Sequence, residues 1–163
     1  MRLDVQAALV RGELVPGDVE VEDGVIVGVG LPSSARDRIA VPGFVDLQVN
    51  GYGGVDFLSA STADYDIAGA ALLEGGVTAY QPTFITAPES VLLDALRAMP
   101  ANGVSPRVVG AHVEGPFLSP ERLGTHPPEH RRDPDLALLA GIDSSDARRR
   151  LEGAGGSVRE ALA

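Results

Sequence analysis

Apolar and polar positions alternate along much of residues 1–40, which predicts β-structure at the start of the chain. Two alternating runs, 19–22 and 25–29, flank Asp23 and Gly24. This dipeptide between alternating runs is typical of a two-residue hairpin turn. We therefore expect residues 3–30 to be all-β and residues 31–40 to form a polar connector.

The pattern changes at residue 42, where a strand with two contrasting faces is predicted over residues 45–50. The two faces carry Val45, Leu47 and Val49 on one side and Asp46, Gln48 and Asn50 on the other. A wholly polar face on so apolar a strand is unusual in a core and favours the lining of a polar cavity. The glycines of Gly51-Tyr-Gly-Gly then predict a turn. The segment does not fit the Walker pattern, so a phosphate-binding loop is not predicted here.

Two helices are predicted next. Thr62 suits the N-cap of a helix over 62–74, and Thr86 with Glu89 forms a capping-box pattern at the start of a second helix. The second helix shows one apolar stripe, formed by Val91, Leu92, Ala95, Leu96 and Met99.

Strands are predicted at 77–81, closed by Pro82, and at 107–113. The order β-α-β-α-β indicates parallel pairing with right-handed crossovers. This order is typical of the opening of a barrel or a doubly wound sheet. A complete eightfold barrel needs roughly 200 residues or more, and the chain has 163.

The tail, residues 133–163, breaks the alternation and predicts three short helices. Asp133 and Pro134 suit an N-cap and a first turn, and Asp143 suits the cap of the second helix. Helices this short are unstable alone in water, so we expect them to pack on each other or on the preceding part. A frayed end is the alternative.

Chemically active side chains gather after the last predicted strand. His112 and Glu114 alternate onto one strand face, and Gly115-Pro116 ends the strand. Glu114 therefore stands at a strand end, where α/β sheets bind ligands. With His126, in a loop stiffened by two prolines, it could form half of a metal-assisted hydrolytic site. A salt-bridge partner and a solvated histidine are the ordinary alternatives, since no His-x-His, Cys-x-x-Cys or His-Glu-x-x-His occurs.

Composition narrows the classes of partner. Thirteen basic and twenty-three acidic residues give a net charge of −10, which argues against nucleic acid and anionic membrane as partners. The chain has no cysteine, no apolar run of about 18 residues and no signal-peptide pattern. We expect a cytoplasmic protein without disulfides.

Three motifs follow one another along the chain: Pro42-Gly-Phe-Val-Asp-Leu-Gln-Val-Asn-Gly-Tyr-Gly-Gly, Gly76-Val-Thr-Ala-Tyr-Gln-Pro-Thr-Phe-Ile-Thr, and His112-Val-Glu-Gly-Pro-Phe-Leu with Gly124-Thr-His. Together they resemble the N-acetylglucosamine-6-phosphate deacetylases of the amidohydrolase superfamily. The resemblance covers about residues 1–132. It implies an α/β fold, with a β-sandwich portion at 1–40 and the first βα units of an incomplete TIM-type (β/α)8 barrel at 41–132. It also implies hydrolysis of the N-acetyl amide of a sugar phosphate.

The resemblance implies a role for several residues. Glu114 matches the metal-binding glutamate. Thr125 and His126 match the pair that contacts substrate, and the histidine is also catalytic. Gln48 and Asn50 stand where many amidohydrolases carry His-x-His, which resembles the single-metal branch, with one divalent ion, zinc by preference, at each site.

The remaining residues of the implied site have no counterpart. Two further metal-binding histidines and a general-base aspartate come from later strands in the family, and His130 lies in the wrong segment. The chain thus resembles a truncated deacetylase that is inactive by itself. Its third barrel strand, predicted at 107–113, lacks the neighbour that the family would provide, so we expect this open edge to make the chain homo-oligomeric or aggregation-prone. A non-catalytic fragment or fusion product and a dihydroorotase-like amidohydrolase are the alternatives. Residues 138–162 resemble the C-terminal segment of N-acetylmuramic acid 6-phosphate etherase.

Overall fold

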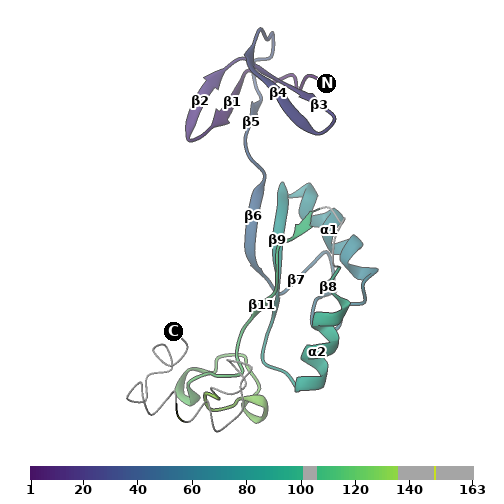
Figure 1. Cartoon of the computed structure of the whole chain (residues 1–163), viewed down its shortest axis with the longest axis vertical. Coiled ribbons are helices and arrows are strands. Elements are labelled where there is room, and N and C mark those ends of the chain that lie inside the picture. The colour runs from purple at the N-terminus through teal and green to yellow at the C-terminus, as the bar shows by residue number, and fades with distance from the viewer. Residues whose placement is uncertain (101–105, 136–148, 150–163) are drawn as a thin grey trace. The chain divides into compact units, whose positions relative to one another are not determined.

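The computed structural model describes residues 1–100, 106–135 and 149 (Figure 1). From position 136 on, the predicted three-helix tail and its etherase-like segment lie outside the described residues, apart from residue 149. The tail therefore stays a prediction. No helix of the described residues is long and apolar enough to cross a membrane.

The chain separates into two units, Met1–Phe44 and Val45–Ala163, and each is described by itself. The strands of the first unit are β1 (Ala7–Val10), β2 (Glu13–Pro16), β3 (Asp18–Glu22), β4 (Val25–Leu31) and β5 (Ile39–Ala40) (Figure 1). β1 pairs antiparallel with β2 and parallel with β5, and β3 pairs antiparallel with β4. The all-β prediction for residues 3–30 is confirmed, whereas the predicted connector at 31–40 ends in the short strand β5.

The predicted hairpin turn is present between β3 and β4. Asp23 and Gly24 have φ values of 48° and 77°. Both residues of a type I′ turn need positive φ, which glycine and aspartate accept more readily than other residues. The local sequence therefore determines the register of this hairpin.

A small apolar cluster, Val5, Ala8 and Val19, stabilises the first unit together with one buried carboxylate. Asp18 is 5% exposed. Its Oδ1 accepts from the N–H groups of Val5 at 3.1 Å and Val19 at 2.8 Å, and its Oδ2 accepts from Arg2 Nε at 2.9 Å. Burial acts to raise the pKa of Asp18, but these three donors outweigh it and hold the pKa below its ordinary value.

The first unit should therefore lose stability in acid. A carboxyl whose pKa is lower in the folded state contributes fully above its unfolded-state pKa of about 4. That contribution is lost as the pH falls through the lower, folded-state pKa. We expect Asp18→Asn to flatten the acid side of a plot of urea midpoint against pH, while Asp4→Asn, at an exposed ion pair with Arg38, leaves it unchanged. Equal flattening by both substitutions would contradict this role for Asp18.

The second unit alternates strands and helices. Its elements are β6 (Phe44–Val49), which begins at the boundary, β7 (Gly51–Tyr52), β8 (Val55–Asp56), α1 (Asp64–Glu74), β9 (Val77–Phe84), α2 (Glu89–Ala98), β10 (Arg107–Val108), β11 (His112–Val113) and the 3-10 turns η1 (Pro120–Arg122) and η2 (Pro128–His130). β7 and β8 form a short antiparallel hairpin. The chain is thus α/β, as predicted, and no closed barrel is present within the described residues.

β9 is the central strand of this unit. β6 pairs with β9 (Figure 1), and β10 and β11 pair with it in parallel. Arg107 is opposite Ala79, whereas His112 is opposite Thr83, so the β10–β11 segment contains one more residue than β9 between these pairs. The predicted continuous strand over 107–113 is therefore divided by a bulge.

The predicted end of the strand at Gln81 is wrong, because β9 continues through Pro82 to Phe84. Pro82 has no N–H to donate to a neighbouring strand. It lies between the residues of β9 that pair with β10 and those that pair with β11. At this irregular point of the ladder a proline is tolerated.

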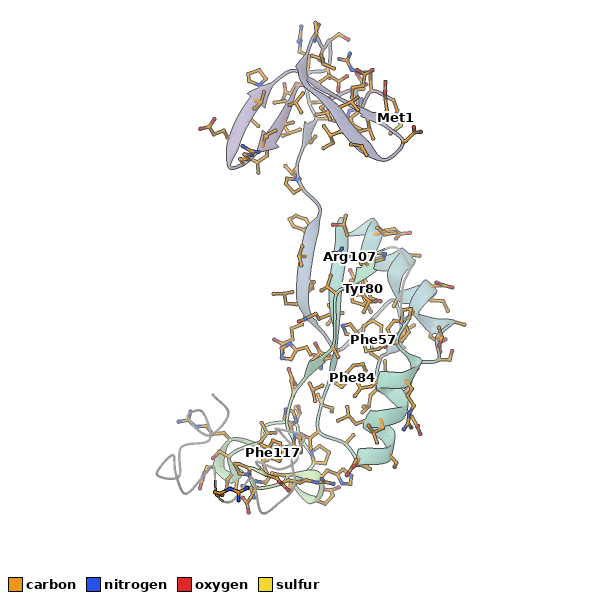
Figure 2. All side chains as sticks on the ribbon, in the orientation of Figure 1. Met1, Phe57, Tyr80, Phe84, Arg107 and Phe117 are labelled. Carbon is orange, nitrogen blue, oxygen red and sulfur yellow. The ribbon has the colours of Figure 1, made fainter. Side chains whose placement is uncertain are left out.

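Both helices contribute to one core against β9. Phe57 stacks on Tyr65 and Tyr80, with ring centroids 5.0 Å and 5.7 Å away. Figure 2 shows Phe57, Tyr80 and Phe84 in the space between the sheet and the helices. The other buried members are Val49, Ala60, Ala68, Leu72 and Ala95. Because this core covers the face of β9 that is turned toward the helices, a binding site can form only on the opposite face.

Three details of the predicted elements are wrong. α1 begins at Asp64 without a side-chain cap, and Thr62 instead donates to the Ala98 carbonyl at 2.9 Å. α2 begins at Glu89 after Pro88, so Thr86 is no cap. Val91 is 40% exposed, outside the buried stripe. Two apolar positions of β6 are also exposed, Val45 and Leu47, while Val49 reaches the core.

Candidate active site

A pocket of about 560 Å³ opens at the ends of β6 and β9. Its lining brings together polar side chains from three strands, with Gln48 on β6 and Asn50 directly after it, Thr83 on β9 and Glu114 directly after β11. Thr125 completes the group from the loop between the two 3-10 turns. Gln48 and Asn50 thus line a polar cavity, as the two-faced strand predicted. Asp46, the third residue of that polar face, instead accepts from the Gln48 N–H at 3.1 Å.

Two side chains after the bulge reach across β9 to β6. His112 Nδ1 lies 2.9 Å from the Leu47 carbonyl oxygen, and Gln48 Nε2 donates to Glu114 Oε1. Because both links end on β6, His112 and Glu114 share one face of the sheet, as predicted. The backbone supports the same register, since the Glu114 N–H donates to the Phe84 carbonyl at 2.8 Å. These contacts hold the Glu114 carboxylate over β9.

The predicted carboxylate and imidazole meet at this strand end. His126 Nε2 lies 3.6 Å from Glu114 Oε2. The side chains are 13% and 22% exposed, so both are largely withdrawn from water while still reachable by a small ligand. Thr125, beside His126 in the chain, lines the same pocket as Glu114. His130 is in η2, and no contact of its side chain connects it to the pocket within the described residues.

Thr86 supports both members of this pair. Its N–H donates to His126 Nδ1 at 3.2 Å, and its Oγ1 lies 3.0 Å from the same nitrogen. The hydroxyl also donates to the Glu114 carbonyl oxygen at 3.2 Å. Thr86 is 2% exposed. The buried Thr86 thus links the backbone carbonyl of Glu114 to the imidazole ring of His126.

Gly115 makes this close approach possible. Its φ is +85°, and a Cβ built there would lie 2.0 Å from Thr86 Oγ1. An L-residue is strained at such a φ, and no side-chain carbon fits at such a distance. The Gly115-Pro116 pair does more than end a strand, as the sequence indicated, because the glycine lets Glu114 and Thr86 lie in contact.

Sequence reasoning missed Thr86, which it assigned to a helix cap. The available signal was Pro88, because proline is common at the first helical turn and so indicates a helix that starts beyond Thr86. The described residues hold no group of three or more His, Cys, Asp or Glu side chains that could bind a metal ion. The structure therefore supplies one carboxylate and one neighbouring imidazole, and no complete metal centre.

Comparisons with known proteins agree on one enzyme class. A curated zebrafish (Danio rerio) N-acetylglucosamine-6-phosphate deacetylase is 39% identical over 106 residues, which cover 60% of this chain and 26% of the relative. The crystal structure of the Thermotoga maritima enzyme of that name matches with a TM-score of 0.74 and 29% identity, over 89% of this chain and 40% of that one. No model of a protein family matches the chain.

A third matching protein was solved with a ligand bound. The deacetylase of Mycobacterium smegmatis, a substituted variant in complex with N-acetyl-D-glucosamine-6-phosphate, matches with a TM-score of 0.68 and 32% identity. The match covers 92% of this chain and 41% of that one. The chain is homologous to N-acetylglucosamine-6-phosphate deacetylases. It spans about a quarter of the length of the zebrafish deacetylase and less than half of either solved chain.

Proposed function

We propose that the chain is the amino-terminal part of a metal-dependent N-acetylglucosamine-6-phosphate deacetylase. In this reading the first unit is a portion of a β-sandwich, and the second carries the first βα units of a (β/α)8 barrel. The observation that supports the proposal most directly is the meeting of Glu114 and His126, 3.6 Å apart, at a strand end. The adjoining pocket is polar and lies at the edge of the sheet where α/β enzymes bind their substrates.

The site residues have distinct proposed roles. Glu114 would hold a divalent metal ion through its carboxylate, and the metal, zinc by preference and one per site, supplies a water of lowered pKa when bound. His126 would donate a hydrogen bond to the amide carbonyl oxygen as negative charge grows there. Thr125, which lines the pocket, would contact the sugar phosphate. An amide is a poor electrophile, and such a donor lowers the barrier to attack on it.

The described residues alone do not fit a complete catalytic zinc site. Such a site takes three protein ligands as a rule, and the described residues contain no group of three metal-binding side chains. The whole sequence has three histidines, His112, His126 and His130. His112 is hydrogen-bonded to the Leu47 carbonyl and His126 to Thr86. Further ligands would have to come from outside the described residues.

A chimera tests the proposed roles. Residues 45–132 of this chain would replace the matching segment of the Mycobacterium smegmatis deacetylase, which supplies the rest of the barrel. We expect acetate release from N-acetylglucosamine 6-phosphate above a blank, and its loss on Glu114→Gln. Glu129→Gln, the same change at an exposed position outside the pocket, is the matched control. A folded chimera without activity, or one that keeps its activity after Glu114→Gln, would refute the assignment.

Zinc should bind the isolated chain weakly or without a defined stoichiometry. One carboxylate and one imidazole fall short of the ligand number of a catalytic zinc. Isothermal titration calorimetry measures this directly. A one-to-one site of submicromolar affinity would contradict the expectation and would indicate that a second copy of the chain supplies ligands.

We also propose that the chain self-associates through β6. Val45 and Leu47 on this strand are 58% and 57% exposed, and exposed apolar strands promote edge-to-edge association. Leu47→Lys should reduce the apparent mass in sedimentation velocity. The matched control is Ile67→Lys, at a 56% exposed helical position. A wild-type chain that sediments as a monomer and unfolds cooperatively would overturn this proposal.

A further inference from the structure

The ring of His126 is fixed through Nδ1. The Thr86 N–H donates to this nitrogen at 3.2 Å, and Nε2 is left to face Glu114 Oε2 at 3.6 Å. Thr86 is buried, so water does not compete for its N–H. The hydrogen bond to Nδ1 therefore indicates which ring nitrogen bears the hydrogen in the neutral imidazole.

The backbone N–H determines where the ring proton lies. A peptide N–H has its hydrogen fixed in the peptide plane and can only donate. The nitrogen that accepts it must present a lone pair, so in the neutral ring the hydrogen is on Nε2. The Thr86 hydroxyl lies 3.0 Å from the same nitrogen and can donate to it as a second donor, or it can turn its hydrogen to the Glu114 carbonyl oxygen, 3.2 Å away.

We propose that Thr86 is a positioning residue that keeps His126 in the Nε2–H tautomer, so that the ring donates a hydrogen bond beside the Glu114 carboxylate. This inference rests on the proposed function, in which a donor is needed at the amide carbonyl oxygen. The opposite tautomer would present a lone pair at Nε2 and would act there as a base or as a metal ligand. Thr86 thereby selects one of the possible roles of a histidine beside Glu114.

The same residue also sets the distance between the two side chains. Its hydroxyl contacts the Glu114 carbonyl while its N–H contacts the imidazole. Gly115, whose Cβ would lie 2.0 Å from Thr86 Oγ1, leaves the space that this bridge requires. Removal of the hydroxyl takes away one of the two donors at Nδ1 and the link to the Glu114 carbonyl, so it should loosen the ring even though the backbone N–H remains.

The tautomer can be measured in the intact chain by nuclear magnetic resonance. Two-bond correlations between the ring carbons' hydrogens and ¹⁵N-labelled ring nitrogens, recorded near pH 8, where an ordinary histidine with a pKa of about 6.5 is neutral, separate protonated from unprotonated nitrogens. His126 should show a protonated Nε2 and an unprotonated Nδ1. His112 is an internal reference of the opposite kind, because its Nδ1 lies 2.9 Å from a carbonyl oxygen and must donate.

Three variants complete the test. Thr86→Val should move the His126 nitrogen signals toward the averaged pattern of a free imidazole, and Thr86→Ser should restore the wild-type pattern. Thr83→Val removes another buried hydroxyl, on β9 three residues before Thr86, and should leave the His126 signals unchanged. A wild-type His126 with a protonated Nδ1, or signals unaltered by Thr86→Val, would overturn the proposal. If Thr86→Val does not fold, the wild-type and Thr86→Ser spectra decide.

The measurement uses neither substrate nor metal, so its outcome is separate from that of the chimera. An inactive chimera with an intact Nε2–H tautomer would reject the proposed function alone. An active chimera whose His126 shows the opposite tautomer would reject the positioning role alone.

Discussion

Gly115→Ala should lower the free energy of unfolding of the second unit by about 3 kcal/mol, which combines typical costs of a strained backbone and of overpacking. At Gly115, φ is +85° and an added Cβ would lie 2.0 Å from Thr86 Oγ1. The substitution should therefore cost both backbone strain and steric overlap, because neither the backbone nor the buried Thr86 can move without breaking a hydrogen bond. The shift of the urea midpoint followed by circular dichroism measures the loss.

Gly124→Ala is the matched control for this substitution. Gly124 also has a positive φ, +60°, but an added Cβ would have no atom within 4 Å. Only the backbone penalty of about 1 kcal/mol is expected there. Faster hydrogen exchange of the Glu114 amide, which donates to Phe84, should accompany Gly115→Ala and not the control. Equal losses in the two variants would show that contact with Thr86 contributes nothing.

The fold was predictable from sequence where the determining interactions are local. The hairpin at Asp23 and Gly24 follows from two residues that accept positive φ, and α1 ends at Glu74, as predicted, with Gly75 directly after it. β9 was predicted three residues too short, because a proline is forbidden in a regular ladder and allowed opposite a bulge. The bulge depends on the pairing of β10 and β11 with β9, which no local pattern encodes.

The part of the site that follows from the alternation of side chains along a strand was predictable from sequence. Alternation placed His112 and Glu114 on one face, and the contacts across β9 to Leu47 and Gln48 agree. Thr86 escaped prediction because its partner His126 is 40 positions away in sequence. A threonine near a helix start suits a cap or a tertiary contact equally well, and only the fold decides between them.

The chain by itself should release no acetate from N-acetylglucosamine 6-phosphate above a blank that contains the same metal salt. Loss of a metal centre or of an acid–base group removes several kcal/mol of transition-state stabilisation, which corresponds to roughly three or more decades in rate. Here the described residues offer no group of three metal-binding side chains. In the proposed role His126 would donate to the carbonyl oxygen of a substrate amide, but an amide without an activated water stays stable.

An acetate assay on the purified chain, with the complete Mycobacterium smegmatis enzyme as the positive control, measures this expectation. Glu114→Gln and Thr86→Val should both match the wild-type chain at the blank, since a site without its remaining ligands has no activity to lose. Acetate release above the blank that disappears on Glu114→Gln would show the opposite. It would mean that copies of the chain assemble a metal centre between them, because the three histidines of one chain do not provide it. In that case the rate should rise with the square of the chain concentration, whereas a trace of contaminating deacetylase would give a rate proportional to concentration and indifferent to Glu114.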